Sequence, residues 1–248
     1  MKKLITVLII FALSTSLYIP AFADDIGLSA KSAILLCADT GDILCENNAD
    51  EVMNIASITK IMTAILVIEN CDNLEAKVKI KPECCNVEGS SMYLEAGKLY
   101  SVKELLLGMM LASGNDAALA LADFISDDFP KLMNDKAKEL GMTNSSFKNP
   151  HGLDEDGHYS TARDMAVLMS YCMNNPEFCE IASTKSADIG KLTFINHNKL
   201  LWNYRGCIGG KTGYTETAGR TLVSCAERNG MKLVCVTLGA PDDWNDHS

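Results

Sequence analysis

The apolar residues of this chain repeat with two different periods, and each period predicts a different kind of element. After Ser57, the residues Ile58, Ile61, Ile65 and Ile68 recur at helical spacing. A helix should therefore begin at or near Ser57. That position would place the serine among free backbone N–H groups, which favour negative charge.

Two further helices are predicted on either side of a polar turn. Residues 101–104 read Ser-Val-Lys-Glu, the sequence of a capping box, and should start a helix. Its apolar stripe comprises Leu105, Leu106, Met109 and Met110. The next helix should begin near Asp116. Farther along, Ser160 and Thr161 can cap a helix that runs to about Met173.

The last part of the chain alternates instead between apolar and polar positions. The runs Thr221–Ala226 and Lys232–Leu238 are typical of strands, and Asn229-Gly230 between them is a strong hairpin signal. Several glycines surround Lys211, and glycine in a strand often marks close approach by a ligand or another backbone. We therefore expect Lys211 at the edge of an antiparallel sheet.

The first residues have the pattern of a secretory signal peptide. A basic start precedes an apolar stretch from Leu4 to Leu17, and Ala21-Phe22-Ala23 gives a small-x-small cleavage site. The apolar stretch is short for a membrane span. We expect residues 1–23 to be removed and residues 24–248 to form one exported domain.

Charge and cysteine content narrow the class of protein further. The formal net charge is −10, and an acidic exported chain without a basic stripe argues against nucleic acid as a partner. The ten cysteines could pair in an exported protein, but the chain is large enough to fold without disulfides, and we favour mostly free, buried thiols. No C-x-x-C or H-E-x-x-H pattern occurs, so no metal site is expected.

Three short strings supply the candidate chemistry. Ser57-Ile58-Thr59-Lys60 would place the serine and the lysine on one helix face, one turn apart. A buried lysine loses affinity for its proton, and the neutral amine can then activate a serine. Ser113-Gly114-Asn115 lies between two apolar helices, and Lys211-Thr212-Gly213 lies in the predicted edge strand.

Each string also has an ordinary structural interpretation. Ser57 could be only an N-cap with Lys60 in solvent, Gly114 only a helix C-cap, and Lys211 only an edge lysine that discourages aggregation. The order of the three strings, and the local structure predicted for each, favours the catalytic interpretation.

With these strings the chain resembles the low-molecular-mass penicillin-binding proteins, specifically the serine-type D-alanyl-D-alanine carboxypeptidases. The resemblance extends from about Ala30 to about Ala240. It includes residues 56–64, 149–153, 158–164, 198–201 and 211–215. It implies an α+β fold of the β-lactamase/transpeptidase-like kind, in which helices flank an antiparallel sheet, an all-helical subdomain is added, and the site lies between them.

The resemblance also implies catalytic roles. Ser57 would attack the carbonyl of a D-Ala-D-Ala peptide bond, and Lys60 would take its proton. Ser113 would relay a proton toward the leaving amine, while Asn115 would hold the substrate amide and Lys60. Lys211 would supply positive potential.

Substrate binding is implied for the residues that continue the third string. Thr212 would bond the terminal carboxylate, and the backbone N–H of Tyr214 would join that of Ser57 in an oxyanion hole. Gly213 and Thr215 would complete the binding strand. The product would be a shortened peptidoglycan stem peptide, β-lactams would acylate the serine, and no cofactor would be needed.

Two departures from the family pattern carry further expectations. Family members commonly continue with a terminal helix, a β-rich domain and an amphipathic membrane anchor, so we expect truncation at the C-terminal helix and membrane association only through a missing anchor. Apolar surface on the strand Lys232–Leu238, including Val234 or its neighbours, should then be exposed. Some relatives also hold the substrate carboxylate with an arginine beyond the last strand, but none follows Arg228 here.

Two other functions remain open from the sequence. A class A-like serine β-lactamase would need a glutamate that activates the deacylating water, and no E-x-x-L-N string lies between Asn115 and Lys211. A non-catalytic module that binds peptidoglycan or β-lactams is disfavoured by the intact strings. A Ser-His-Asp hydrolase is disfavoured because no G-x-S-x-G elbow occurs. His151 and His158 lie among the acidic residues 154–156 and are assigned to loop structure.

Overall fold

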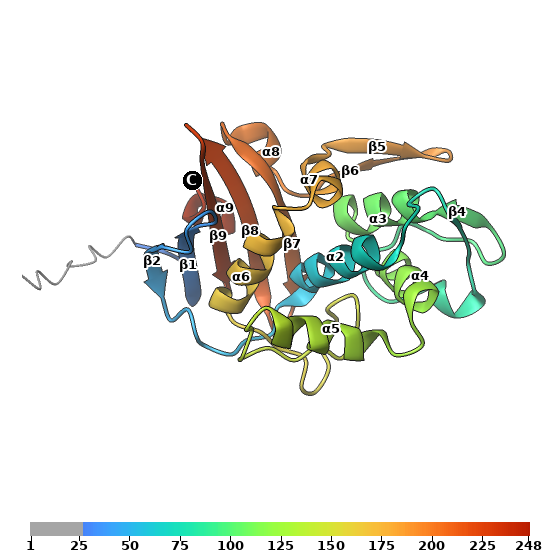
Figure 1. The fold of residues 1–248 in the computed structure, drawn as a ribbon, viewed down its shortest axis with the longest axis horizontal. Coiled ribbons are helices and arrows are strands. Elements are labelled where there is room, and N and C mark those ends of the chain that lie inside the picture. The colour runs from blue at the N-terminus through green and yellow to red at the C-terminus, as the bar shows by residue number, and fades with distance from the viewer. Residues whose placement is uncertain (1–26) are drawn as a thin grey trace, which may run out of the picture.

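A five-stranded antiparallel sheet lies beside a group of helices in the computed structural model, which describes residues 27–248 (Figure 1). Its strand order is β2-β1-β9-β8-β7. These strands are β1 (Ser32–Cys37), β2 (Ile43–Asn47), β7 (Cys207–Thr215), β8 (Gly219–Arg228) and β9 (Met231–Leu238). Two small antiparallel pairs are β3 (Lys77–Lys79) with β4 (Leu99–Ser101), and β5 (Ser186–Ile189) with β6 (Leu192–Ile195). The predicted α+β architecture and the position of Lys211 on an edge strand are confirmed.

The helices begin close to the predicted positions. They are η1 (Ala56–Thr59), α2 (Lys60–Asn70), η2 (Pro82–Cys84), α3 (Val102–Leu111), α4 (Asn115–Ile125), α5 (Phe129–Glu139), α6 (Ala162–Cys172), α7 (Pro176–Ser183), α8 (Leu200–Asn203) and α9 (Asp243–Asp246). Ser101 and Glu104 form the expected capping box at the start of α3. The Thr161 side chain accepts the backbone N–H of Asp164 and caps α6.

The tight turn between β8 and β9 is confirmed in detail. Asn229 and Gly230 both adopt left-handed backbone conformations, with φ of 54° and 78°. Two consecutive residues with positive φ are the requirement of the hairpin turn whose twist matches the flanking strands. The turn sets the register in which Arg228 pairs with Met231, and the same register continues to Thr221 opposite Leu238.

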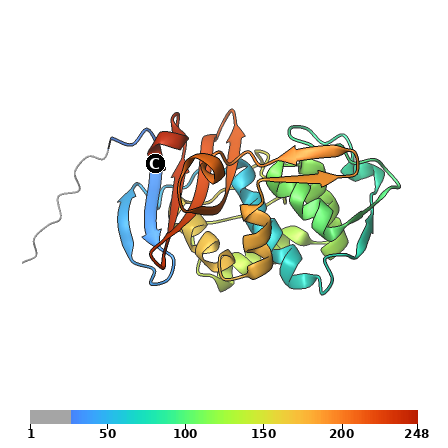
Figure 2. The same cartoon turned by 90° about the horizontal axis from the view of Figure 1, so that it is seen from above.

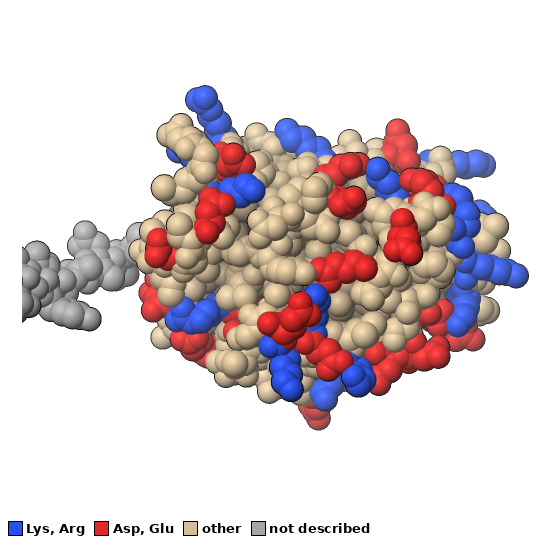
Figure 3. All heavy atoms as spheres, viewed as in Figure 1, with Lys and Arg blue, Asp and Glu red and all other residues tan. Residues whose placement is uncertain are grey.

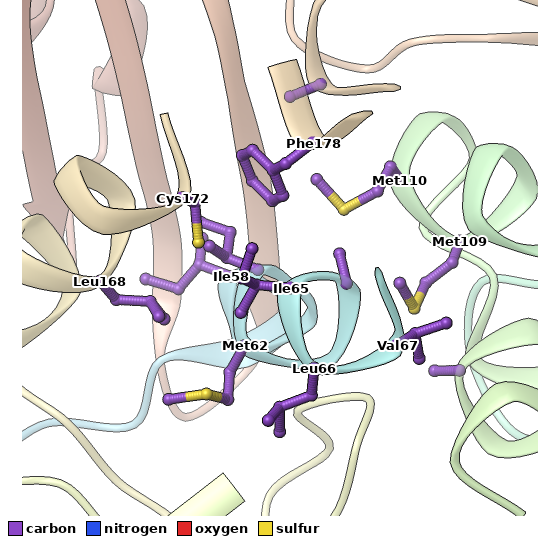
Figure 4. Close-up of a cluster of buried hydrophobic side chains, with 14 of the residues drawn as sticks. Ile58, Met62, Ile65, Leu66, Val67, Met109, Met110, Leu168, Cys172 and Phe178 are labelled. Atoms are coloured by element: carbon purple, nitrogen blue, oxygen red, sulfur yellow. The ribbon is translucent and has the colours of Figure 1, made fainter. Parts of the chain in front are cut away.

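The apolar core is built around α2, whose residues are buried on every side from Lys60 to Ile68. Figure 4 shows side chains of η1 and α2 meeting those of α3, α6 and α7 in one cluster. Its labelled members are Ile58, Met62, Ile65, Leu66, Val67, Met109, Met110, Leu168, Cys172 and Phe178. The nucleophile candidate therefore directly precedes a helix that is buried on every side over most of its length.

The structure shows which face of β9 is buried, where we expected exposed apolar surface. Val234 is fully buried, and its face of the sheet lies beneath α6, so of the two alternatives, Val234 or its neighbours, the predicted exposure does not apply to the valine. Its neighbours Leu233 and Cys235 point to the opposite face and are half-buried. There they border a cavity of about 170 Å³ that His247 also lines.

Helices α2 to α5 gather on the side of β7 and form the helical part of the molecule. Figures 1 and 2 both place the β5–β6 hairpin beside α3 and β4, at the end of the molecule opposite β2. The edge strand β7 contacts η1 and α7, so the sheet and the helical part meet along this edge.

The remaining sequence expectations concern thiols, membrane and export. All ten cysteines lie within residues 27–248 as free thiols, four buried and six half-buried. No helix in that range is long and apolar enough to cross a membrane. The predicted signal peptide, residues 1–23, lies outside the described residues. Acidic and basic side chains are interspersed over the face shown in Figure 3.

Candidate active site

Ser57 and Lys60 lie at the junction of η1 and α2, on the side of α2 that faces the sheet edge. The Nζ atom of Lys60 is 2.8 Å from Ser57 Oγ. It also donates hydrogen bonds to Asn115 Oδ1 at 2.7 Å and to the carbonyl oxygen of His151 at 2.6 Å. The exposed fraction of Lys60 is 0%, whereas Ser57 is only half-buried, so the serine alone of this pair is open to a substrate.

Burial lowers the pKa of Lys60 well below its usual value, because an ammonium ion is poorly solvated in this interior. The positive charge of Lys211 lowers it further, while the carboxylate of Asp116 acts in the opposite direction. The neutral amine predicted from the first string is thus favoured by its surroundings. The solvent-exposed alternative for Lys60 is wrong.

The backbone on either side of the cleft is held in an unusual conformation. Ala56, directly before the nucleophile candidate, has φ of 50°, and Ser113 has φ of 61°. Non-glycine residues in this region cost free energy and often occur at functional sites. Ser57, which follows Ala56, and Ser113 both line the same cleft.

A close approach between β7 and η1 explains why a glycine follows Thr212. A Cβ atom at Gly213 would lie 2.8 Å from the backbone nitrogen of Ser57 and 3.1 Å from the Cβ of Ala56. Any side chain there would push the strand away from the nucleophile. This is the close approach that the glycines around Lys211 predicted.

The second hydroxyl is linked to the third string. Lys211, which is almost completely buried, donates a hydrogen bond from Nζ to Ser113 Oγ at 3.0 Å. Burial lowers the pKa of Lys211 to about 7. Two hydroxyl–amine pairs, Ser57 with Lys60 and Ser113 with Lys211, therefore face one another across the cleft.

The cleft between these pairs has a volume of about 590 Å³. Its lining residues are Ser57, Ser90, Ser113, His197, Lys199, Thr212, Gly213, Tyr214, Arg220, Asp243 and Trp244. Of the residues predicted to bind substrate, Thr212, Gly213 and Tyr214 line it. Thr215 differs: its hydroxyl donates to Asp154 and accepts the backbone N–H of Ala218, so it closes the turn after β7.

Several lining residues were missed from the sequence, and Arg220 is the most informative. No arginine follows the last strand, but this one comes from β8, where it pairs in register with Tyr214 of the edge strand. Its only described partner is Asp243, at 3.5 Å. The register of the β7–β8 hairpin would have placed it opposite Tyr214, two residues along the edge strand from Thr212.

His151 contributes through its backbone, and His158 is structural. Burial and the charge of Lys60 lower the pKa of His151 to about 4, so its ring is neutral near pH 7. The His158 ring bonds Thr59 Oγ1 and the backbone N–H of Lys148, which fixes the loop, as predicted. Among residues 27–248, no group of three or more His, Cys, Asp or Glu side chains is arranged to hold a metal ion.

Solved structures with the same fold include DD-peptidases and transpeptidases. A D-alanyl-D-alanine carboxypeptidase from Mycobacterium tuberculosis is 33% identical, with a TM-score of 0.83 and coverage of 88% of both chains. A mutant of the Streptomyces K15 DD-transpeptidase is 32% identical, with a TM-score of 0.86, and covers 89% of this chain and 95% of its own. Fold and site together define a serine acyl-transfer protein of the penicillin-binding class.

The family follows from sequence comparison. The family model described as D-alanyl-D-alanine carboxypeptidase matches residues 20–242, and this chain belongs to that family. The carboxypeptidase DacF of Bacillus subtilis is 38% identical over 259 residues, which cover 97% of this chain and 67% of DacF. DacC of Escherichia coli is 39% identical over 231 residues, 87% of this chain and 58% of DacC.

Proposed function

We propose that this protein is an exported serine D-alanyl-D-alanine carboxypeptidase. It removes the terminal D-alanine from peptidoglycan stem pentapeptides through an acyl-enzyme on Ser57, and penicillin acylates the same serine. The observation that carries this proposal is the set of three contacts at Lys60 Nζ. Family membership supports it independently.

The three contacts at Lys60 Nζ determine whether Lys60 or Ser57 is the donor in the hydrogen bond between them. A neutral amine has two N–H donors and one lone pair. The oxygens of Asn115 and His151 can only accept, so they engage both N–H groups of Lys60. The lone pair is left facing Ser57 Oγ, which can then donate its proton as the hydroxyl attacks the substrate carbonyl.

The oxyanion of the tetrahedral intermediate is bound by the backbone N–H groups of Ser57 and Tyr214. The close approach of β7 to η1 at Gly213 supports this pairing, because it brings the two backbone segments to opposite sides of one small space. Preorganised donors of this kind lower the barrier by stabilising charge that develops only in the transition state.

Proton delivery to the leaving amine is assigned to Ser113. Its hydroxyl accepts from Lys211, whose pKa near 7 lets it hold or release a proton at neutral pH. Asn115 has its amide nitrogen bonded to the carbonyl of Glu88 and its oxygen bonded to Lys60, so it positions the base.

The substrate carboxylate is placed at the Thr212 end of the cleft. The Thr212 hydroxyl can donate to it, and Lys211 contributes positive potential. The Arg220 guanidinium adds a charge on the same side, since Arg220 lines the cleft and its contact with Asp243 is a long one. Arg220 supplies from β8 the charge that some relatives place beyond the last strand.

The β-lactamase alternative is less well supported. Efficient deacylation in that class needs a glutamate that activates water beside the acyl-serine. Among the described residues that line this cleft, the one acidic side chain is Asp243, and it pairs with Arg220. The acyl-enzyme formed with penicillin should therefore persist.

A single experiment distinguishes the functions. The purified protein is mixed with fluorescent penicillin, and free D-alanine is measured after incubation with a stem pentapeptide. The carboxypeptidase should become stably labelled and should release D-alanine. Rapid turnover of penicillin would identify a β-lactamase, and the absence of both reactions would leave a binding module.

A further inference from the structure

Tyr93 is an exposed aromatic residue in a strained backbone conformation, and the proposed mechanism does not use it. Its exposed fraction is 73%, and its φ is 62°. A bulky residue with positive φ is an outlier that persists only where the surrounding structure holds it. No apolar packing compensates a side chain that faces solvent to this extent.

A buried carboxylate holds the turn that presents this tyrosine. Asp116, with an exposed fraction of 1%, accepts the hydroxyl of Ser91 at 2.6 Å and the backbone N–H groups of Met92 and Leu94 at 3.0 Å each. Hydrogen bonds to a charged acceptor are the strong kind, so they can maintain the strained residue between them.

The same turn is continuous with the catalytic cleft. Asn115, next to Asp116, donates its backbone N–H to the carbonyl of Ser90 at 2.7 Å, and Ser90 lines the cleft. The start of α4 therefore holds Lys60 through the side chain of Asn115 and the Tyr93 turn through that of Asp116. A ligand that leaves the cleft past Ser90 meets Tyr93 three residues later.

Beyond the turn lies a groove of about 370 Å³ between β4 and the tip of the β5–β6 hairpin. It is lined by Met92, Tyr93, Glu95, Lys98, Tyr100, Ile189, Gly190, Lys191, Leu192 and Phe194. Tyr93 and Tyr100 contribute accessible aromatic rings to the lining and Phe194 a nearly buried one, while the Glu95–Lys98 ion pair and Lys191 contribute charged groups. Rings that present an apolar face together with rim hydrogen-bonding groups suit a sugar, whose faces are C–H bonds and whose edges are hydroxyls.

The length of helix α3, which joins the groove side to the cleft side of the molecule, is comparable with the length of a stem peptide. Helix α3 separates Tyr100 from Ser113, and its ten residues span about 15 Å. The four stem residues on the amino side of the scissile bond extend over roughly 13–14 Å. The first of them is joined to the glycan strand, so a stem bound at Ser57 can deliver its sugar to the groove.

We propose that this groove binds the glycan to which the stem peptide is attached, with Tyr93 stacking on a sugar ring. The inference rests on the proposed carboxypeptidase function and adds a substrate preference to it. The enzyme should favour glycan-linked pentapeptides over free ones, which restricts its action to assembled or lipid-carried wall material.

The test compares one pentapeptide in two forms, free and attached to the disaccharide of N-acetylglucosamine and N-acetylmuramic acid. Tyr93→Asn removes the ring but tolerates positive φ, so the turn should persist. We expect KM for the disaccharide-linked form to rise roughly three- to tenfold, the scale of one lost stacking contact, with no change for the free peptide. Tyr93→Phe keeps the ring and should behave as the unaltered protein.

The controls distinguish failure of the glycan-binding proposal from failure of the proposed carboxypeptidase function. Phe124→Ala removes another exposed aromatic ring, on α4 and outside the groove, and should leave both KM values unchanged. Melting temperature and penicillin labelling report whether Tyr93→Asn is folded. Equal KM changes for both substrates, or no change for either, would overturn the glycan assignment. Failure of the unaltered protein to hydrolyse either substrate would instead overturn the carboxypeptidase function.

Discussion

Replacing Lys60 by arginine tests the centre of the proposed mechanism. The substitution puts a permanently positive group at the base of the cleft and removes the lone pair that faces Ser57 Oγ, because a guanidinium stays protonated in proteins. If Lys60 acts as the base, Lys60→Arg must fail even though the side chain can carry a positive charge. If Lys60 acts only as a cation, the variant should keep much of its activity.

The expected loss can be estimated from the role of the amine. A positioned general base contributes about 10²–10⁴ in rate, or about 3–5 kcal/mol at 1.36 kcal/mol per tenfold. Lys60 is fully buried and already bonded on three sides, so the larger guanidinium also has to displace the oxygens of Asn115 or His151. We therefore expect acylation to fall by at least a factor of about 10².

The assay is the second-order rate of acylation by fluorescent penicillin. Lys60→Met, which lacks both charge and lone pair, should lose a similar factor, since the base is missing in both variants. Lys79→Arg, on the exposed face of β3, is the matched control and should acylate at the normal rate. Acylation by folded Lys60→Arg within threefold of the unaltered protein would refute the assignment of Lys60 as base.

The remaining predictions concern the nucleophile, the carboxylate pocket and pH. Ser57→Ala should abolish penicillin labelling and D-alanine release with little change in melting temperature, and labelling at another serine would contradict the assignment. Thr212→Val and Arg220→Gln should each weaken acylation roughly ten- to hundredfold for ligands that carry the carboxylate, because a charge-assisted hydrogen bond of about 1.5–3 kcal/mol is lost. Amidated analogues should lose less, and equal losses would place both residues outside the pocket. Acylation should fall at low pH as Lys60 gains a proton, and should fall again above about pH 7 as Lys211 loses the proton that gives it positive charge. Lys211→Arg should move the alkaline limb to higher pH, and an unmoved limb would mean that another group titrates there.

Features that depend on a few neighbouring residues could be predicted from the sequence. The capping box at Ser101, the left-handed turn at Asn229-Gly230 and the one-turn spacing of Ser57 and Lys60 all follow from local geometry. Each is set by backbone conformation or side-chain reach within about four residues, so the surrounding fold can hardly change it.

The sequence did not determine which element covers each face of the sheet. Alternation along Lys232–Leu238 showed that one face is buried but not which helix covers it. The packing of α6 on β9 buries Val234, and the opposite face borders the cavity near His247. Side chains on a strand have a period of two, so the pattern gives two faces, and only tertiary packing assigns them.

The sequence determined which reactive side chains the site contains. The tertiary structure determined the protonation state of Lys60 and which distant residues enter the site. Lys60 meets the oxygen of Asn115 from 55 residues away and the backbone carbonyl of His151 from 91 residues away. A carbonyl has no signature in the sequence, since every residue carries one. Arg220 likewise enters the cleft only through the register of β7 with β8. Desolvation, which lowers the pKa of Lys60 and makes it a base, belongs to the assembled core, because no single segment of the chain can exclude water from an amine.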